Sequence, residues 1–210
     1  MSIELENVAP SEIEKRSFEI ITEELAGLKI PADTEPIVKR CIHTSADFEY
    51  AESLVFSENA INQAQNAIKN GASIVTDTQM VKAGINKKVL AQFGGQVHCF
   101  MSDEDVMEEA KSRGVTRATV SMEKAAKLNA PLIFAVGNAP TALVAIHRLI
   151  TTGQLDPKLI IGVPVGFVNV VQSKELIIEL DQTPYIVARG RKGGSNIAAC
   201  ICNALLYQIK

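Results

Sequence analysis

Residues 132–151 read LIFAVGNAPTALVAIHRLIT and contain the unit from which the fold is built. The unbroken apolar run at residues 132–136 is typical of a strand buried on both faces of a parallel sheet. Gly137 and Asn138 interrupt this run, and Pro140 fits the first turn of a helix that continues to residue 151. The stretch therefore predicts a buried strand, a short loop and a helix in direct succession.

The same alternation occurs along most of the remaining chain. The expected strands cover residues 72–75, 96–100, 132–136, 159–163 and 185–188. The helices expected between and after them cover residues 58–70, 86–93, 103–128, 140–151, 170–180 and 196–208. This pattern predicts a three-layer α/β fold with a five-stranded, mainly parallel sheet that is doubly wound and flavodoxin-like. Ligands of such sheets bind beyond the carboxyl ends of the strands.

The beginning of the chain has a different pattern, which predicts helices and loops. One helix is expected over residues 13–25. Thr34 and Pro36 mark the start of a second helix, over residues 36–44, with Thr34 as the N-cap and Pro36 in the first turn.

Composition restricts the class of protein. A chain of 210 residues, 47% hydrophobic and 21% charged, is expected to form one domain, 1–210, with a helical segment over about 1–56 and an α/β core over about 57–210. The net charge of −3 argues against a nucleic-acid partner, which requires a basic surface.

No signal peptide and no membrane-spanning apolar stretch is visible, so we expect no membrane partner and a cytoplasmic location. The cysteines lack zinc-site spacing, so they are expected to be buried thiols and no metal site is predicted.

The stretch RCIHTSADF at residues 40–48 concentrates groups that can do chemistry, including one of only three histidines. Histidine gives or takes a proton near neutral pH, because its unperturbed pKa is about 6.5. The guanidinium of Arg40 can grip a carboxylate with a fixed fork of donors. Arg40 and His43 are three residues apart and thus share a helix face, which favours acid–base chemistry on an anionic substrate. The alternative is a helix end at which His43 caps carbonyls and Asp47 solvates a turn.

Two loops at expected strand ends favour an anionic ligand. At residues 137–141, Gly137 permits close approach of the backbone, and free N–H groups at a helix start attract negative charge. Residues 189–195 read RGRKGGS, with three cations and three glycines before a helix. This stretch contains neither G-x-x-x-x-G-K-[ST] nor G-x-G-x-x-G, so a carboxylate-rich organic ligand suits it as well as a phosphate does. A plain strand–helix turn and a solvated turn are the respective alternatives.

Five motifs follow one another in a recognisable order. They are IEKRSFEII at 13–21, HTSAD at 43–47, GNAPTAL at 137–143, IGVPVGFV at 161–168 with SKE at 173–175, and GRKGGS at 190–195. In this order they resemble the precorrin-8X methylmutase family, whose members move a methyl group on ring C during corrin (vitamin B12) synthesis. The resemblance runs from about residue 10 to residue 206, and it too implies a flavodoxin-like fold.

The resemblance implies a role for each candidate side chain. It makes His43 the proton donor and acceptor, and it makes Ser17 and Arg40 substrate-binding residues. The other implied substrate-binding residues are Thr44, Arg117, Asn138, Arg189 and Arg191. Three positions depart from the residues usual in the family: Ala118, which weakens the match around Arg117, and the milder Ser45 and Gln172.

The implied activity is an isomerase reaction. A methyl group would move between adjacent carbons of ring C of precorrin-8X or cobalt-precorrin-8, giving hydrogenobyrinate or cobyrinate. The resemblance implies no cofactor, no external methyl donor, a corrinoid tetrapyrrole as substrate and a homodimer. One alternative is a non-catalytic corrinoid-binding module, which would share the anion-binding residues without needing His43. Another is a phosphate- or nucleotide-dependent α/β enzyme, against which the missing fingerprints argue.

Overall fold

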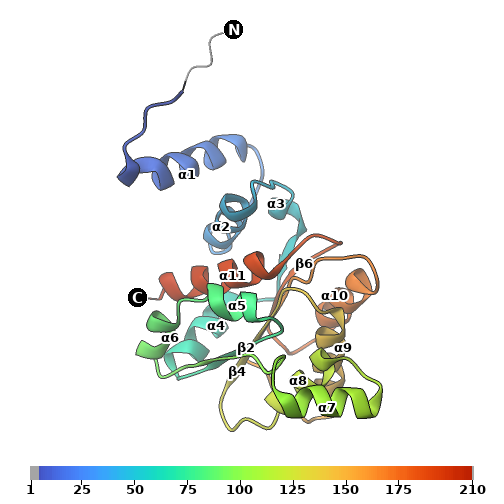
Figure 1. Cartoon of the computed structure of the whole chain (residues 1–210). Coiled ribbons are helices and arrows are strands. Elements are labelled where there is room, and N and C mark those ends of the chain that lie inside the picture. The colour runs from blue at the N-terminus through green and yellow to red at the C-terminus, as the bar shows by residue number, and fades with distance from the viewer. Residues whose placement is uncertain (1–4, 210) are drawn as a thin grey trace.

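The computed structural model describes residues 5–209 and is built around one sheet (Figure 1). Its strands are β1 (Leu54–Phe56), β2 (Ser73–Thr76), β3 (Val97–His98), β4 (Leu132–Val136), β5 (Leu159–Gly162) and β6 (Tyr185–Ala188). They lie in the order β1-β6-β5-β4-β2-β3. All neighbouring strands are parallel except β1 and β6, which are antiparallel, with Val55 opposite Val187.

The sheet has six strands rather than the five expected, although all five expected strands are present. The additional strand, β1, has 3 residues and directly follows the short helix α3 (Tyr50–Ser53). Elements this short show no hydrophobic period in the sequence. The position of β1 depends on its pairing with β6, more than a hundred residues away, which no local pattern encodes.

Helices cover both faces of the sheet, which gives the three expected layers. On one face lie α4 (Ala60–Lys69), α5 (Gln79–Gly84), α6 (Lys87–Gln92) and α11 (Ser195–Tyr207). On the other lie α8 (Arg117–Ala125), α9 (Pro140–Thr151) and α10 (Val170–Ile178), with α7 (Glu104–Arg113) packed against α8. In β4, Ile133 and Ala135 pack into the first core while Phe134 and Val136 pack into the second. This division follows from the alternation of side chains along a strand.

One sequence-based expectation about helices is wrong, and another holds only in part. The single helix expected over residues 103–128 is two helices, because Gly114 ends α7 in the left-handed conformation (φ 64°). Thr116 then caps α8 by accepting a hydrogen bond from the N–H of Thr119. Thr34 does lie at the N-cap position of α2 (Glu35–Ser45), but its hydroxyl donates to the carbonyl of Pro31 and caps no helix N–H.

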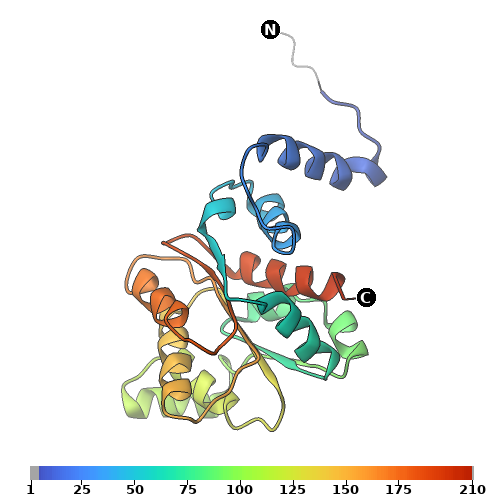
Figure 2. The same cartoon turned by 180° about the vertical axis from the view of Figure 1, so that it is seen from behind.

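The N-terminal helices form an outer layer on one side of the molecule (Figures 1 and 2). After the short helix η1 (Pro10–Glu12), α1 (Ile13–Glu24) packs against α2, and α2 packs against α11. Ile37, Val38, Cys41 and Ile42 form the buried face of α2, at the spacing of a helix that covers another helix. Within residues 5–209, no helix is both long enough and apolar enough to cross a bilayer.

Candidate active site

His43 lies in the last turn of α2, on the side that faces α1. Its ring stacks on Phe18, with centroids 5.1 Å apart and an interplanar angle of 21°. The guanidinium carbon of Arg40 lies 4.9 Å from the centroid of the same Phe18 ring. One aromatic ring thus contacts both residues, which share a face of α2 as their spacing predicts. His43 is exposed, so a ligand can reach its imidazole.

Ser17 and Arg40 have partners within the chain. The Ser17 hydroxyl donates to the carbonyl of Ile13 at 2.9 Å, a bond that a helical serine makes without any ligand. Arg40 forms an ion pair with Glu14 of α1. Both side chains of this pair are more than a third exposed, so solvent screens their attraction. A carboxylate of a ligand can therefore replace Glu14 at small cost.

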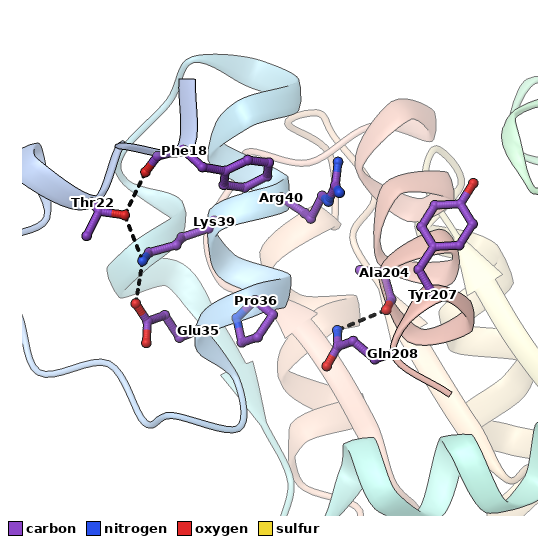
Figure 3. Close-up of a pocket in the computed structure, with 9 residues that line it drawn as sticks. All are labelled: Phe18, Thr22, Glu35, Pro36, Lys39, Arg40, Ala204, Tyr207 and Gln208. Atoms are coloured by element: carbon purple, nitrogen blue, oxygen red, sulfur yellow. Dashed lines mark hydrogen bonds and ion pairs between the residues drawn. The ribbon is translucent and has the colours of Figure 1, made fainter. Parts of the chain in front are cut away.

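Arg40 lies between two adjoining hollows on the surface. One has a volume of about 530 Å³ and is shown in Figure 3, where Arg40 lies between Phe18 of α1 and Tyr207 of α11. Lys39 closes another side of this hollow and binds Glu35 and the Thr22 hydroxyl. The second hollow, of about 310 Å³, is lined by Arg40, Thr44, Gly84, Asn196, Ala199, Cys200, Asn203, Ala204 and Tyr207. Both hollows run along the seam between α2 and α11, with Arg40 common to them.

Thr44 and Cys200 line the second hollow together. The Thr44 hydroxyl donates to the Cys200 sulfur at 3.2 Å. A hydrogen bond from Cys41 lowers the pKa of the Cys200 thiol, and Thr44 and the charge of Arg40 act in the same direction. Cys200 is only half-buried, so the expectation of buried apolar thiols fits Cys41, Cys99 and Cys202 but not this residue.

A second group of residues lies at the carboxyl ends of β2 and β4. The buried carboxylate of Asp77, which directly follows β2, accepts three backbone hydrogen bonds, from the N–H groups of Gly137 (2.9 Å), Asn138 (2.8 Å) and Ala139 (2.6 Å). Burial raises the pKa of Asp77, while the three N–H donors oppose that shift. Since all three partners are donors, they favour the ionised carboxylate, which is acceptor-only.

The N–H groups of residues 137–139 therefore bind an anion that belongs to the protein. The sequence predicted that these groups are free for an anionic ligand, and that prediction is wrong. The exposed Asn138 is held by its backbone N–H, which leaves its side chain as the group that this loop can offer. Asp77 was missed by sequence analysis, although a carboxylate separated by one residue from the apolar run 72–75 marks a strand end.

The 189–194 loop, defined as the segment between β6 and α11, is fixed at several points. A Cβ on Gly193 would lie 2.1 Å from the carbonyl oxygen of Val163, so only glycine fits where the loop crosses the end of β5. Lys192 binds Asp47 at 2.6 Å and Glu49 at 2.7 Å. These ion pairs bring the loop to the connection between α2 and α3, next to the His43 motif.

The basic residues of this region differ in their surroundings. Arg189 pairs with Glu175 of α10 at 3.4 Å. Arg191 lies over Phe167, with its guanidinium carbon 5.4 Å from the ring centroid. Lys174, also missed by sequence analysis, is fully buried beneath the loop. The sequence does indicate that Lys174 is buried, because Val170 and Ile177 lie four residues before it and three after it, on the apolar face of the same helix.

Arg117 is the first residue of α8, and α8 packs against α9 on the face of the sheet opposite to α11. Its guanidinium donates to the carbonyl of Met101 at 3.5 Å. The adjacent Thr116 hydroxyl donates to Thr141, which places this helix start beside that of α9 and near the Asn138 loop. None of the Arg117 hydrogen bonds or ion pairs within residues 5–209 reaches α2. The structure thus brings Arg40, His43 and Thr44 together, ties the 189–194 loop to them, and keeps Arg117 apart.

The part of the chain that the structure describes contains no group of three or more His, Cys, Asp or Glu side chains that could hold a metal ion.

Residues 12–208 match the family described as precorrin-8X methylmutase. The chain is 48% identical over 198 residues to the cobalt-precorrin-8 methylmutase of Priestia megaterium, covering 94% of this chain and 88% of that relative. It is 44% identical over 201 residues to the cobalt-precorrin-8 methylmutase of Leptospira interrogans, covering 92% and 91%. A solved structure of the precorrin-8X methylmutase from Thermus thermophilus superposes with a TM-score of 0.84 at 36% identity, covering 93% of this chain and 96% of that one.

Proposed function

We propose that this chain, which belongs to the precorrin-8X methylmutase family, uses His43 to move a proton on a corrin-type tetrapyrrole while a methyl group migrates between adjacent ring carbons. The chain is a methylmutase of cobalamin biosynthesis, an isomerase of the intramolecular transferase class. The observation that supports the role of His43 is its exposed ring, stacked on Phe18 beside Arg40.

In the proposed mechanism, His43 donates a proton to the macrocycle near ring C. The protonated tautomer favours migration, in which the methyl–carbon bond breaks at one ring carbon and forms at its neighbour. His43 then takes the proton back, so the reaction exchanges no electrons with another molecule and loses no atom. Acid–base help of this kind contributes about 10²–10⁴ in rate. Holding the ring in a reactive geometry contributes the rest.

Basic and polar side chains bind the carboxylate arms of the substrate in this proposal. The residues are Ser17, Arg40, Thr44, Arg117, Asn138, Arg189 and Arg191. Arg40 and Thr44 are supported by their place in the hollows between α2 and α11. Phe167 and Val168, which are 79% and 80% exposed beside Arg191, offer an apolar surface to the face of the macrocycle.

The protein is proposed to act as a homodimer with each site near the subunit interface. The hollows beside Arg40 are open to solvent, and a second subunit would cover a substrate held there. The strongly exposed Phe167 and Val168 lie together on the loop after β5, as is typical of a surface that contacts another molecule. Twofold dimers are the commonest symmetric assemblies.

The remaining expectations complete the proposal. The parallel strands alone follow the order β3-β2-β4-β5-β6, which supports a doubly wound, flavodoxin-like arrangement. The four cysteines, all within the described residues, are free thiols and suit a reducing cytoplasm. We propose no cofactor and no nucleic-acid or membrane partner. Of the three similar proteins named above, two are cobalt-precorrin-8 methylmutases and one is a precorrin-8X methylmutase. The higher identity of the first two supports the cobalt-bearing precursor as the substrate.

The test is the absorbance change on mixing the protein with cobalt-precorrin-8 or precorrin-8X. His43→Ala should abolish conversion yet keep the affinity for the product within about tenfold, because His43 moves a proton and Arg40 contributes the grip. His98→Ala is the matched control, because His98 stacks on Phe100 away from α2. Equal loss of conversion in both variants, or full activity in His43→Ala, would exclude the proposed proton transfer. A wild-type chain that binds the corrinoid without converting it would instead be a binding module.

A further inference from the structure

Lys174 of α10 has an unusual environment. Its side chain is 0% exposed, and its ammonium donates to the carbonyls of Gly190 and Lys192, each at 2.8 Å. The carbonyl between them, that of Arg191, accepts a hydrogen bond from the N–H of Gly166 at 3.1 Å. Three successive carbonyls of the 189–194 loop are thus bound, two by the buried Lys174 and the middle one by the half-buried Gly166 of the loop after β5. The positions of the side chains on this loop therefore depend on Lys174.

The charge of Lys174 has no carboxylate partner among the described residues, where its ammonium forms no ion pair. A buried charge without a counterion is unfavourable, because desolvation opposes it. This burial lowers the pKa of Lys174 to about 8, although the charge of the adjacent Glu175 acts in the opposite direction. Two carbonyl dipoles satisfy its hydrogen bonds, and the charge of the adjacent Glu175, which also pairs with Arg189, offsets the effect of burial only in part. A burial of this kind is uncommon in a structural lysine.

The charges around the loop show what Lys174 adds. The loop carries three basic side chains, Arg189, Arg191 and Lys192. Three carboxylates face them: Glu175 binds Arg189, while Asp47 and Glu49 bind Lys192. These six groups balance, so Lys174 supplies the surplus positive charge of the cluster. Because it is buried, this charge is screened by water less than a surface cation is.

We propose that Lys174 is a positioning residue that holds the 189–194 loop in its binding conformation and gives this loop its preference for carboxylate arms of the tetrapyrrole. The inference rests on the proposed function, because it takes the loop as part of the substrate site. Lys174 does not touch the substrate in this proposal; it acts through Arg191 and the loop backbone.

Two variants separate the charge of Lys174 from its hydrogen bonds. Lys174→Gln removes the charge and keeps an N–H donor, whereas Lys174→Arg keeps the charge. Lys158→Gln is the matched control, because it removes one positive charge at the opposite end of β5, where Lys158 pairs with Asp156. Affinities for cobyrinic acid and for a corrinoid with amidated carboxylates are measured by spectroscopic titration at low salt, and circular dichroism checks the folding of each variant.

We expect Lys174→Gln to weaken binding of the carboxylate form by about tenfold and of the amidated form by less than about twofold. Lys174→Arg should keep the preference within about threefold, and Lys158→Gln should leave it unchanged. Equal losses for both ligands, or no loss in Lys174→Gln, would overturn the role of Lys174. If Lys174→Gln does not fold, loss of the preference in Lys174→Arg overturns it. A wild-type chain that binds neither corrinoid overturns the proposed function itself.

Discussion

Replacing Asp77 by asparagine removes one negative charge from beneath the β4–α9 loop and leaves the shape of the side chain almost unchanged. In the wild type, one carboxylate oxygen accepts from Gly137 and the other accepts from Asn138 and Ala139. A carboxamide has one acceptor oxygen, and its NH₂ group can only donate. At least one of the three backbone N–H groups must then face another donor in a site where Asp77 is 0% exposed.

The expected cost follows from these contacts. A buried donor that loses its charged acceptor costs about 1.5–3 kcal/mol. The two bonds that remain change from charge-assisted to neutral and lose roughly half their strength, about 1 kcal/mol each. Relief of the burial that raises the Asp77 pKa offsets part of this sum. We therefore expect Asp77→Asn to lower the free energy of unfolding by about 2–4 kcal/mol.

The assay is urea unfolding followed by circular dichroism, in which the midpoint should fall while the m-value stays constant. Asp156→Asn is the matched control, because the Asp156 side chain is 87% exposed and pairs with Lys158 on the surface. That variant should change stability by less than about 1 kcal/mol. If Asp77→Asn is as mild as Asp156→Asn, the carboxylate does not hold the loop, and the N–H groups of residues 137–139 return as candidates for binding an external anion.

Two further predictions concern the basic residues. Arg40→Ala should weaken binding of the carboxylate corrinoid by about 1.5–3 kcal/mol and binding of its amidated form much less. Arg148→Ala, which breaks an ion pair with Glu123 far from α2, should leave both affinities unchanged. Equal losses for both ligands in Arg40→Ala would make Arg40 structural. Because burial lowers the pKa of Lys174 to about 8, the unfolded chain binds more protons between about pH 8 and 10. Over that pH window, urea titrations should show the free energy of unfolding of the wild type rising relative to that of Lys174→Met by up to about 3 kcal/mol. A difference between the two proteins that stays constant with pH would contradict the lowered pKa of Lys174.

The elements that the sequence predicted best are those that a local pattern specifies. The strand at 132–136 and the helix at 140–151 have the expected bounds, because an apolar run and a proline in the first turn mark them. The break between α7 and α8 was missed, since Gly114 within an amphipathic pattern does not by itself show that the chain turns there. The strand β1 was missed for another reason, because its pairing partner is distant in the sequence.

In the candidate site, too, the features that local spacing specifies could be predicted, and those that depend on distant contacts could not. The shared face of Arg40 and His43 follows from helical spacing, and the contacts with Phe18 agree with it. The partner of the 137–139 loop could not be predicted, because Asp77 lies about sixty residues earlier and meets the loop through the pairing of β2 with β4. A free helix start and one closed by an internal carboxylate have the same local sequence, so only the tertiary structure distinguishes them.

Asp77 and Lys174 play opposite parts at neighbouring strand ends, and together they constrain how this chain can bind a polyanion. The buried carboxylate takes up the N–H groups of the β4–α9 loop, so these main-chain donors are not available to a substrate. The buried ammonium binds two carbonyls of the 189–194 loop, and Glu175, which also pairs with Arg189, offsets only part of its charge. An acidic chain, with a net charge of −3, can then attract a carboxylate-bearing macrocycle only through side chains gathered locally. In the two proposals made above, exposed arginines supply direct contacts, and the buried lysine supplies a field that salt screens less than it screens theirs.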